Sequence, residues 1–137
     1  MSKDLDNLVR INLLKPEPAD QREIDGLLQS GRARLRDAKN TTISFESRFD
    51  LAYNAAHALA LAALRACGYR PNNARFVVFQ ALPHTLGVGT DVWRVLDKCH
   101  AVRNAAEYEG IFDDDEQLLA DLLNAADAVN KALGKTG

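Results

Sequence analysis

The amino-acid sequence predicts an all-α protein, a four- or five-helix up-and-down antiparallel bundle. Apolar residues recur with the three-and-four spacing of amphipathic helices in several long segments. No segment shows the convincing alternation of apolar and polar residues that indicates a half-buried strand. The connections between the segments are short, which favours antiparallel neighbours. The 137 residues fit one domain of this kind.

The N-terminal segment, residues 1–19, is predicted to be a short helix or an arm that docks on a partner. Pro16 and Pro18 end its weak amphipathic pattern, because proline lacks an amide hydrogen and clashes with the preceding helical turn. The bundle domain is predicted to span residues 20–134.

The first long helix is predicted over residues 21–40. Asp20 can cap it, with Glu23 three residues later as the reciprocal partner of a capping box. Gly31 is expected to weaken its middle. The second half of this helix is basic through Arg32, Arg34, Arg36 and Lys39. These side chains form either a solvated helix face or a contact for phosphate or an acidic partner.

The segment from Phe45 to Cys67 is predicted to be the longest and most buried helix. Ser44 is a plausible cap, Gly68 is a favourable C-terminal stop, and Pro71 follows as expected. Many alanines lie in this segment, and their small side chains allow a neighbouring helix to approach closely.

The rest of the chain predicts three further helices. One begins at Asn72 or Asn73 and is bent or ended by Pro83. Another runs from Trp93 to Gly110 after a cap at Thr90 or Asp91. The last begins in the acidic run of residues 113–116 and ends at Gly134. These acids favour capping over metal binding, because adjacent carboxylates on one turn point to different sides.

Composition and charge exclude several classes of protein. The net charge is −2 at pH 7, so no global positive field draws the chain to nucleic acid, and such binding needs a local basic patch. The longest apolar run is too short to span a bilayer, and the N-terminal residues lack a signal-peptide core. We therefore expect a cytoplasmic protein. Cys67 and Cys99 are expected to be buried free thiols. No spacing suggests zinc, and no cofactor is implied.

The helix from Trp93 to Gly110 carries the candidate catalytic residues. It gathers an imidazole, a guanidinium, an amide, a carboxylate and a phenol within two turns: His100, Arg103, Asn104, Glu107 and Tyr108. Because residues three and four apart meet on a helix surface, these groups can act together. An exposed helix face without a function can present the same set.

A second candidate set would line a small-ligand pocket between helices. Its members are Tyr53, His57, Trp93 and His100. Helix bundles build ligand sites from facing helices in this way. Alternatively, His57 is a satisfied core or interface histidine, and Trp93 is a large core residue near a helix start.

Three stretches resemble the HEPN family of small all-helical domains. They are the alanine-rich helix FESRFDLAYNAAHALALAALRACGYRP, the Gly-Tyr-x-Pro turn at its end, and the later RNAAEYEG. The resemblance spans roughly Ile24 to Val129 and is nearest to the small stand-alone bacterial members. It implies a helical bundle that dimerises. Many HEPN proteins are metal-independent ribonucleases, often toxins of toxin–antitoxin pairs. The implied partners are a second copy, RNA, and an antitoxin or nucleotidyltransferase-like protein.

The family's nuclease signature is an arginine, a polar residue and, a few positions later, a histidine. Arg103 matches the arginine and Asn104 the polar residue, whereas Tyr108 stands where the histidine should come. Arg103 could steady charge on a phosphate, since guanidinium binds phosphate with two parallel hydrogen bonds. A tyrosine with a pKa of about 10 is a poor base at neutral pH, so Glu107 or His100 would have to take that role.

Three functions therefore stay open. The first is a homodimeric HEPN-like RNA-directed module with an altered ribonuclease site. The second is a catalytically inert relative, in which Arg103 and Glu107 form an ordinary stabilising ion pair at helical spacing. The third is a protein that binds a small ligand between its helices.

Overall fold

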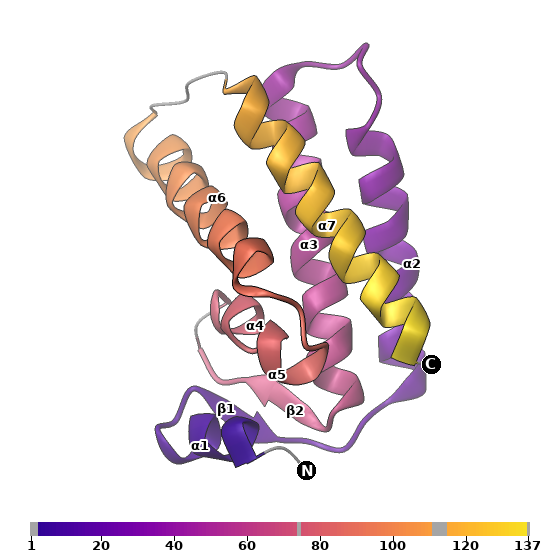
Figure 1. Ribbon diagram of the computed structural model, residues 1–137, viewed down its shortest axis with the longest axis vertical. Helices are drawn as coiled ribbons and strands as arrows, with labels where there is room; N and C mark the ends of the chain where they lie inside the picture. Colours follow the sequence, from indigo (N-terminus) through magenta and orange to yellow (C-terminus); the bar gives the residue numbers. More distant parts are fainter. Residues whose placement is uncertain (1–2, 74, 111–114, 137) are drawn as a thin grey trace.

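The all-α prediction is confirmed. The structure, a computed structural model, describes residues 3–73, 75–110 and 115–136. Its elements are α1 (Lys3–Arg10), β1 (Leu14–Pro16), α2 (Gln21–Ala38), α3 (Phe45–Ala66), β2 (Tyr69–Pro71), α4 (Val77–Gln80), α5 (Leu82–Thr85), α6 (Thr90–Glu109) and α7 (Glu116–Thr136). Four long helices form the bundle, and the short elements gather at the end where the N-terminus lies (Figure 1).

The helix α3 is the centre of the bundle. It contacts α2 and α7 extensively, and it also contacts α4, α5, α6 and β2. Ser44 caps it as predicted, because its Oγ accepts a hydrogen bond from the amide of Ser47 at 3.1 Å. The chain leaves α3 at Gly68, whose φ of +89° is a conformation that glycine adopts without strain. The alanine-rich segment is therefore the element around which the others pack.

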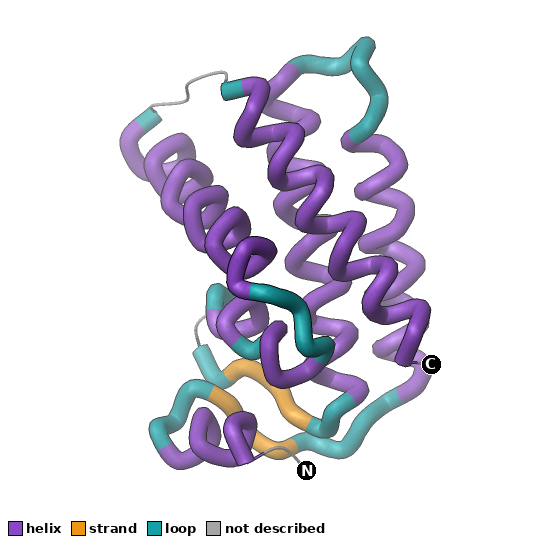
Figure 2. The backbone as a smooth tube through the Cα atoms, viewed as in Figure 1, coloured by secondary structure: helices purple, strands orange, loops and turns teal. Residues whose placement is uncertain are grey.

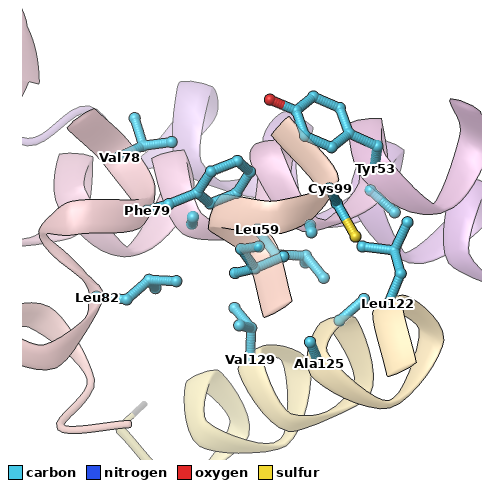
Figure 3. Packing of buried hydrophobic residues seen from close by; sticks show 14 of the residues in the cluster. Tyr53, Leu59, Val78, Phe79, Leu82, Cys99, Leu122, Ala125 and Val129 are labelled. Atoms are coloured by element: carbon cyan, nitrogen blue, oxygen red, sulfur yellow. The ribbon is translucent and has the colours of Figure 1, made fainter. Parts of the chain in front are cut away.

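One apolar core joins α3 to the helices that surround it. Side chains from α3, α4, α5, α6 and α7 meet there, including Leu59, Phe79, Leu82, Cys99 and Leu122, each without exposed surface (Figure 3).

Cys99 and the partly buried Cys67 are both free thiols, as predicted. Burial raises the pKa of Cys99 to about 12. No helix in the described ranges has the length and apolarity needed to cross a bilayer.

Gly31 has a packing role that the sequence did not reveal. A Cβ at this position would lie 2.9 Å from Cγ of Leu59 and 3.3 Å from the carbonyl oxygen of Ala55. The missing side chain thus lets α2 approach α3 closely, as the alanines of α3 do from the other side. The prediction that Gly31 merely weakens its helix is incomplete, because the tertiary contact needs the absent methyl group.

Substitution of Gly31 by alanine is expected to lower the free energy of unfolding by up to about 2 kcal/mol. Overpacking costs about 1–3 kcal/mol, whereas the gain in helix propensity is about 1 kcal/mol. Gly26→Ala in the same helix is the matched control, because a Cβ there meets nothing within 4 Å. It should stabilise the protein by about 0.5–1 kcal/mol. Urea denaturation measures both, and equal stabilisation by the two alanines would contradict this account.

The N-terminal segment packs on its own chain. α1 is a short helix as predicted, and Leu5 and Leu14 are 2% and 1% exposed against the core cluster. The strand β1 pairs with β2 in an antiparallel register that sets Leu14 opposite Pro71 (Figure 2). The expectation of no strand was wrong for these residues. Strands of three residues are too short to show alternation, and their pairing depends on a contact distant in the sequence.

Arg65 holds this segment against the bundle. We call Arg65, Arg70 and the residues that they bind the arginine clasp: Glu17, Pro18, Glu23 and Tyr69. The side chain is 1% exposed, and its Nε donates to Glu23 at 2.6 Å. Its terminal nitrogens donate to the carbonyl oxygens of Glu17, Pro18 and Tyr69 at 3.0, 2.7 and 3.1 Å. One of them also lies 3.4 Å from the Glu17 carboxylate. Four of the five N–H groups of the guanidinium therefore donate a hydrogen bond, and the ion pair with Glu17 adds to them.

A second arginine closes the clasp on its solvent side. Arg70 pairs with the same two carboxylates, Glu17 and Glu23, each at 2.6 Å. The hydrogen bonds from Arg65 and then Arg70 hold the pKa of Glu23 below its usual value. Asp20 caps α2 through the amides of Arg22 and Glu23 as predicted. The carboxylate of Glu23, which was expected to complete a capping box with Asp20, instead pairs with Arg65 and Arg70 of the arginine clasp.

Several predicted boundaries are wrong. The helix expected to begin at Asn72 or Asn73 begins at Val77 instead, and it is two short helices, α4 and α5. Pro83 sits at the start of α5, where its missing amide hydrogen costs nothing. Gly89, rather than Thr90 or Asp91, occupies the N-cap of α6, so no N-cap side chain accepts a hydrogen bond from the first turn of this helix. The end of α6 at Gly110, with φ of +70°, is as predicted.

The last helix is capped as expected and is longer than expected. Asp115 accepts a hydrogen bond from the amide of Leu118 at 2.9 Å, so this member of the acidic run is a cap. Asp113 and Asp114 lie outside the described residues. The helix α7 continues through Gly134, the predicted end, to Thr136.

The basic half of α2 is partly engaged with α7. Arg32 donates to Asn130 at 2.8 Å, and Lys39 forms an ion pair with Asp127 at 2.9 Å. Both contacts are exposed, so their contribution to stability is at most about 1 kcal/mol each. This favours the solvated-face interpretation for these two residues.

Candidate functional site

The packing of α6 beside α3 brings the two predicted residue sets together at Tyr53. Its ring is 3% exposed, and its hydroxyl lies 2.8 Å from Nδ1 of His100. The guanidinium carbon of Arg103 lies 5.1 Å from the centre of the same ring, within the range of a cation–π contact. One tyrosine from α3 therefore orients an imidazole and a cation from α6.

His100 has partners at both ring nitrogens. The amide nitrogen of Asn104 lies 3.2 Å from Nε2, so Nε2 accepts and the neutral ring donates its Nδ1 proton to Tyr53. Burial lowers the pKa of His100, Asp97 opposes that shift, and the charges of Arg103 and Arg75 add to it. The ring is therefore neutral at physiological pH, which is the form that can take a proton.

Arg103 lies at an open cleft between the start of α3 and the second half of α6. Its side chain is 26% exposed; Nε lies 3.3 Å from Asp50, and a terminal nitrogen lies 3.5 Å from Glu107. The cleft has a volume of about 420 Å³, and its lining residues are Glu46, Ser47, Phe49, Asp50, Arg103, Ala106 and Glu107. Three carboxylates face one guanidinium, so the cleft of a single copy is net negative.

The structure connects four of the five predicted catalytic residues and leaves Tyr108 apart. His100 and Arg103 both contact Tyr53. Asn104 contacts His100 one helical turn away, and Glu107 contacts Arg103 in the same way. Tyr108 is 79% exposed and is not among the residues that line the cleft. The phenol in the place of the family's histidine is thus a surface side chain outside the cleft that Arg103 lines.

The predicted ligand-binding residues form one aromatic cluster, and phenylalanines connect them. The ring of Phe76 lies 4.5 Å from His100 and 6.4 Å from Trp93, measured between ring centres. The buried Phe79 contacts Phe76, Tyr53 and His57 edge to face. Sequence reasoning assigned Phe76 only to the apolar side of a helix, and no local pattern distinguishes it from a core residue.

His57 is a buried member of this cluster with an unmet hydrogen-bonding group. It is 9% exposed, and its Nε2 has no partner among the described residues. Burial lowers its pKa to about 4; the charge of Arg75 adds to this, and a hydrogen bond to the Arg75 backbone opposes it. His57 is therefore neutral at pH 7 and lies in the core as one interpretation expected, but it is not the satisfied histidine of that interpretation, because Nε2 has no partner among the described residues.

In the ranges that the structure describes, no three His, Cys, Asp or Glu side chains lie where they could hold a metal ion. The chain matches no protein-family model, no curated protein and no solved structure. The resemblance to HEPN domains therefore rests on the sequence pattern alone.

Proposed function

We propose that this chain is a HEPN-like homodimeric RNA-directed module of the cytoplasm, with a metal-independent ribonuclease site built on Arg103 and His100. The observation that carries the proposal is that a guanidinium and a neutral imidazole both contact Tyr53, with the guanidinium at the wall of an open cleft. This pair supplies the two groups that cleavage through a 2′-hydroxyl needs, a base and a cation.

His100 takes the role that the family gives to its later histidine. Nε2 accepts the proton of the ribose 2′-hydroxyl once the side chain of Asn104 turns aside. The 2′-oxygen then bonds to phosphorus and forms a 2′,3′-cyclic phosphate, while the bond to the 5′-oxygen breaks and this oxygen takes up a proton from water; the imidazolium of His100 returns its own proton to the solvent. Arg103 stabilises the charge that develops on the phosphoryl oxygens. Tyr108, which is exposed, has no part in this scheme.

The proposed dimer would place two guanidiniums at one groove. Asp50 and Glu107 already lie beside Arg103, so one copy offers an anion little net attraction. A second copy that faces the first would add its own guanidinium together with its own carboxylates, so a bound phosphate has to replace Asp50 and Glu107 as the partner of each Arg103. The helix α6 has room for such contact, because only Leu96 and Cys99 of its residues, all of which are described, are buried. The exposed Tyr108 ring suits an interface anchor.

The Arg103→Ala variant is expected to cut RNA about 10²–10³-fold more slowly than the parent, the usual loss when one group that stabilises transition-state charge is removed. His100→Gln should lose activity to a similar extent, because glutamine cannot take the proton. Tyr108→Phe is the matched control and should cut at the parental rate. The measurement is cleavage of end-labelled RNA with metal chelated. A parent that cuts nothing, or an Arg103→Ala variant that cuts as fast, rules out the nuclease.

A catalytically inert interaction protein is the second candidate. The two carboxylates at Arg103 favour it, because they give the guanidinium a structural role between α3 and α6. In that case Arg103→Ala lowers the melting temperature by a few degrees and changes no activity. Sedimentation equilibrium separates the two further, because a strictly monomeric chain cannot build the shared groove.

A further inference from the structure

We infer that Phe76, Trp93 and His100 form a stacking subsite for an unpaired base of single-stranded RNA, and we call these three residues the aromatic platform. The inference rests on the proposed RNA-directed function and names its substrate class. It concerns a surface of a single copy, formed by α6 and the turn before α4. Two of its three residues, Phe76 and Trp93, have no part in the proposed cleavage chemistry.

Planar groups follow one another in an unbroken series from this platform to Arg103. The ring centres of Trp93 and Phe76 are 6.4 Å apart, and those of Phe76 and His100 are 4.5 Å apart. The series continues from His100 to Tyr53 at 6.4 Å and ends with the Arg103 guanidinium over Tyr53 at 5.1 Å. A base that stacks on the platform therefore lies close to the cation proposed to hold the phosphate.

The platform combines exposed rings with a rigid support. Phe76, Trp93 and His100 are each partly exposed, whereas Tyr53 and Phe79 beneath them are 3% and 0% exposed. Phe79 meets the Phe76 ring edge to face at 5.9 Å, which fixes the orientation of that ring from below. Rings held in this way lose little freedom when a base stacks on them, so little of the stacking energy is spent on ordering.

Two arginines lie at the ends of the platform. Arg75, exposed and next to Phe76 in the chain, acts electrostatically on Tyr53, His57 and His100. Arg103 is the second cation, and Asp50 and Glu107 pair with it. Asp97 also acts on His100 from α6, so the local net charge does not by itself attract a phosphate. Stacking, which tolerates any base, then provides most of the affinity.

Single-stranded RNA fits this surface better than a duplex. In a duplex the faces of the bases are already stacked, and an A-form helix shows proteins its phosphates and 2′-hydroxyls. A duplex binder needs a broad basic face, whereas this chain has a net charge of −2. An unstacked base next to one or two bound phosphates matches an aromatic platform between two arginines.

Trp93 makes the test direct, because it is the single tryptophan of the chain. A base that stacks on the platform quenches its fluorescence. The full chain is titrated with an unstructured ten-nucleotide RNA, 2′-O-methylated so that it cannot be cut, while the anisotropy of a labelled copy reports binding independently. We expect quenching that follows binding. An abasic sugar–phosphate chain of equal length and a duplex of the same sequence should both leave Trp93 unquenched.

Two substitutions test the residues themselves. Phe76→Leu should weaken RNA binding about tenfold, within the range measured when an aromatic partner of a base is removed. Phe45→Leu is the matched control, since it removes another partly buried phenylalanine ring, at the start of α3. Arg75→Gln should weaken binding severalfold, whereas Arg34→Gln on α2 should not. The quenching of the parent chain needs no substitution and stands even if Phe76→Leu fails to fold.

The outcomes separate this inference from the proposed function. RNA that binds by anisotropy without quenching Trp93 overturns the platform and leaves the RNA-directed function intact. Binding and quenching without any cleavage of unmodified RNA support the platform and refute the nuclease. A mononucleotide that quenches Trp93 as effectively as the oligonucleotide would show a nucleotide site, which overturns the assignment to RNA. Absence of both signals refutes the RNA-directed function and the platform together.

Discussion

Substitution of Arg65 by methionine is expected to lower the free energy of unfolding by about 3–5 kcal/mol, the usual cost of removing one partner from a buried ion pair. Methionine retains much of the side-chain volume but donates no hydrogen bond. The carbonyl oxygens of Glu17, Pro18 and Tyr69 would each lose a donor, and the carboxylate of Glu23 would lose its buried partner. Because the guanidinium is 1% exposed, water cannot replace these contacts without opening the structure.

Arg70→Met is the matched control for this variant. Arg70 pairs with the same two glutamates, but its side chain is 31% exposed. Its loss should cost about 1 kcal/mol or less, because solvent screens the pair and rehydrates the carboxylates. Guanidinium denaturation measures both variants. If the two substitutions cost the same, burial is not what makes the arginine clasp strong.

The protein is expected to lose about 3 kcal/mol of stability through His57 alone as the pH falls from about 6.5 towards 4. The folded-state pKa of His57 is about 4, below the value of about 6.5 in an unfolded chain. Between these two pKa values the imidazole of His57 binds a proton in the unfolded chain but not in the folded protein, so acid favours unfolding. The stabilisation is complete above the unfolded pKa and disappears as the pH approaches the folded one.

His57→Leu isolates this effect, because leucine does not titrate. Its stability should fall less steeply with acid than that of the parent, and the difference should be confined to the window between pH 6.5 and 4. At pH 7 the variant should lose about 1 kcal/mol, because it gives up the hydrogen bond to the Arg75 backbone, whereas the Nε2 atom that it removes has no partner among the described residues. Parallel curves for His57→Leu and the parent would show that the acid sensitivity has another source.

Local rules predicted the helical framework well. Asp20 and Ser44 correctly indicated where helices begin, and Gly68 and Gly110 where they end, because helix caps depend on a few neighbouring residues. What depends on distant contacts was missed. The β1–β2 pair has no local signature, and Gly31 looked like a weakness until its contact with Leu59 was visible. A charged residue in the last turn of a helix, such as Arg65, normally suggests exposure.

The candidate site was predicted in its parts but not in its arrangement. Helical spacing alone placed His100 beside Asn104 and Arg103 beside Glu107. It could not show that Tyr53 from α3 bridges His100 and Arg103, or that Asp50 shares the guanidinium. The spacing that joined Asn104 to Tyr108 predicted one group of residues, but packing left Tyr108 79% exposed. Periodicity assigns residues to a helix face and does not identify what that face meets.

The short ladder between Leu14 and Pro71 also sets an order of assembly. The helices α2 and α3 are neighbours in the chain, so their contacts close a small loop and form early. β1 can find its partner strand only after α2 and α3 have brought the two ends of that long loop together. On this argument the N-terminal segment joins after α2 and α3 have paired, and its amides should exchange with solvent early when the native protein opens locally.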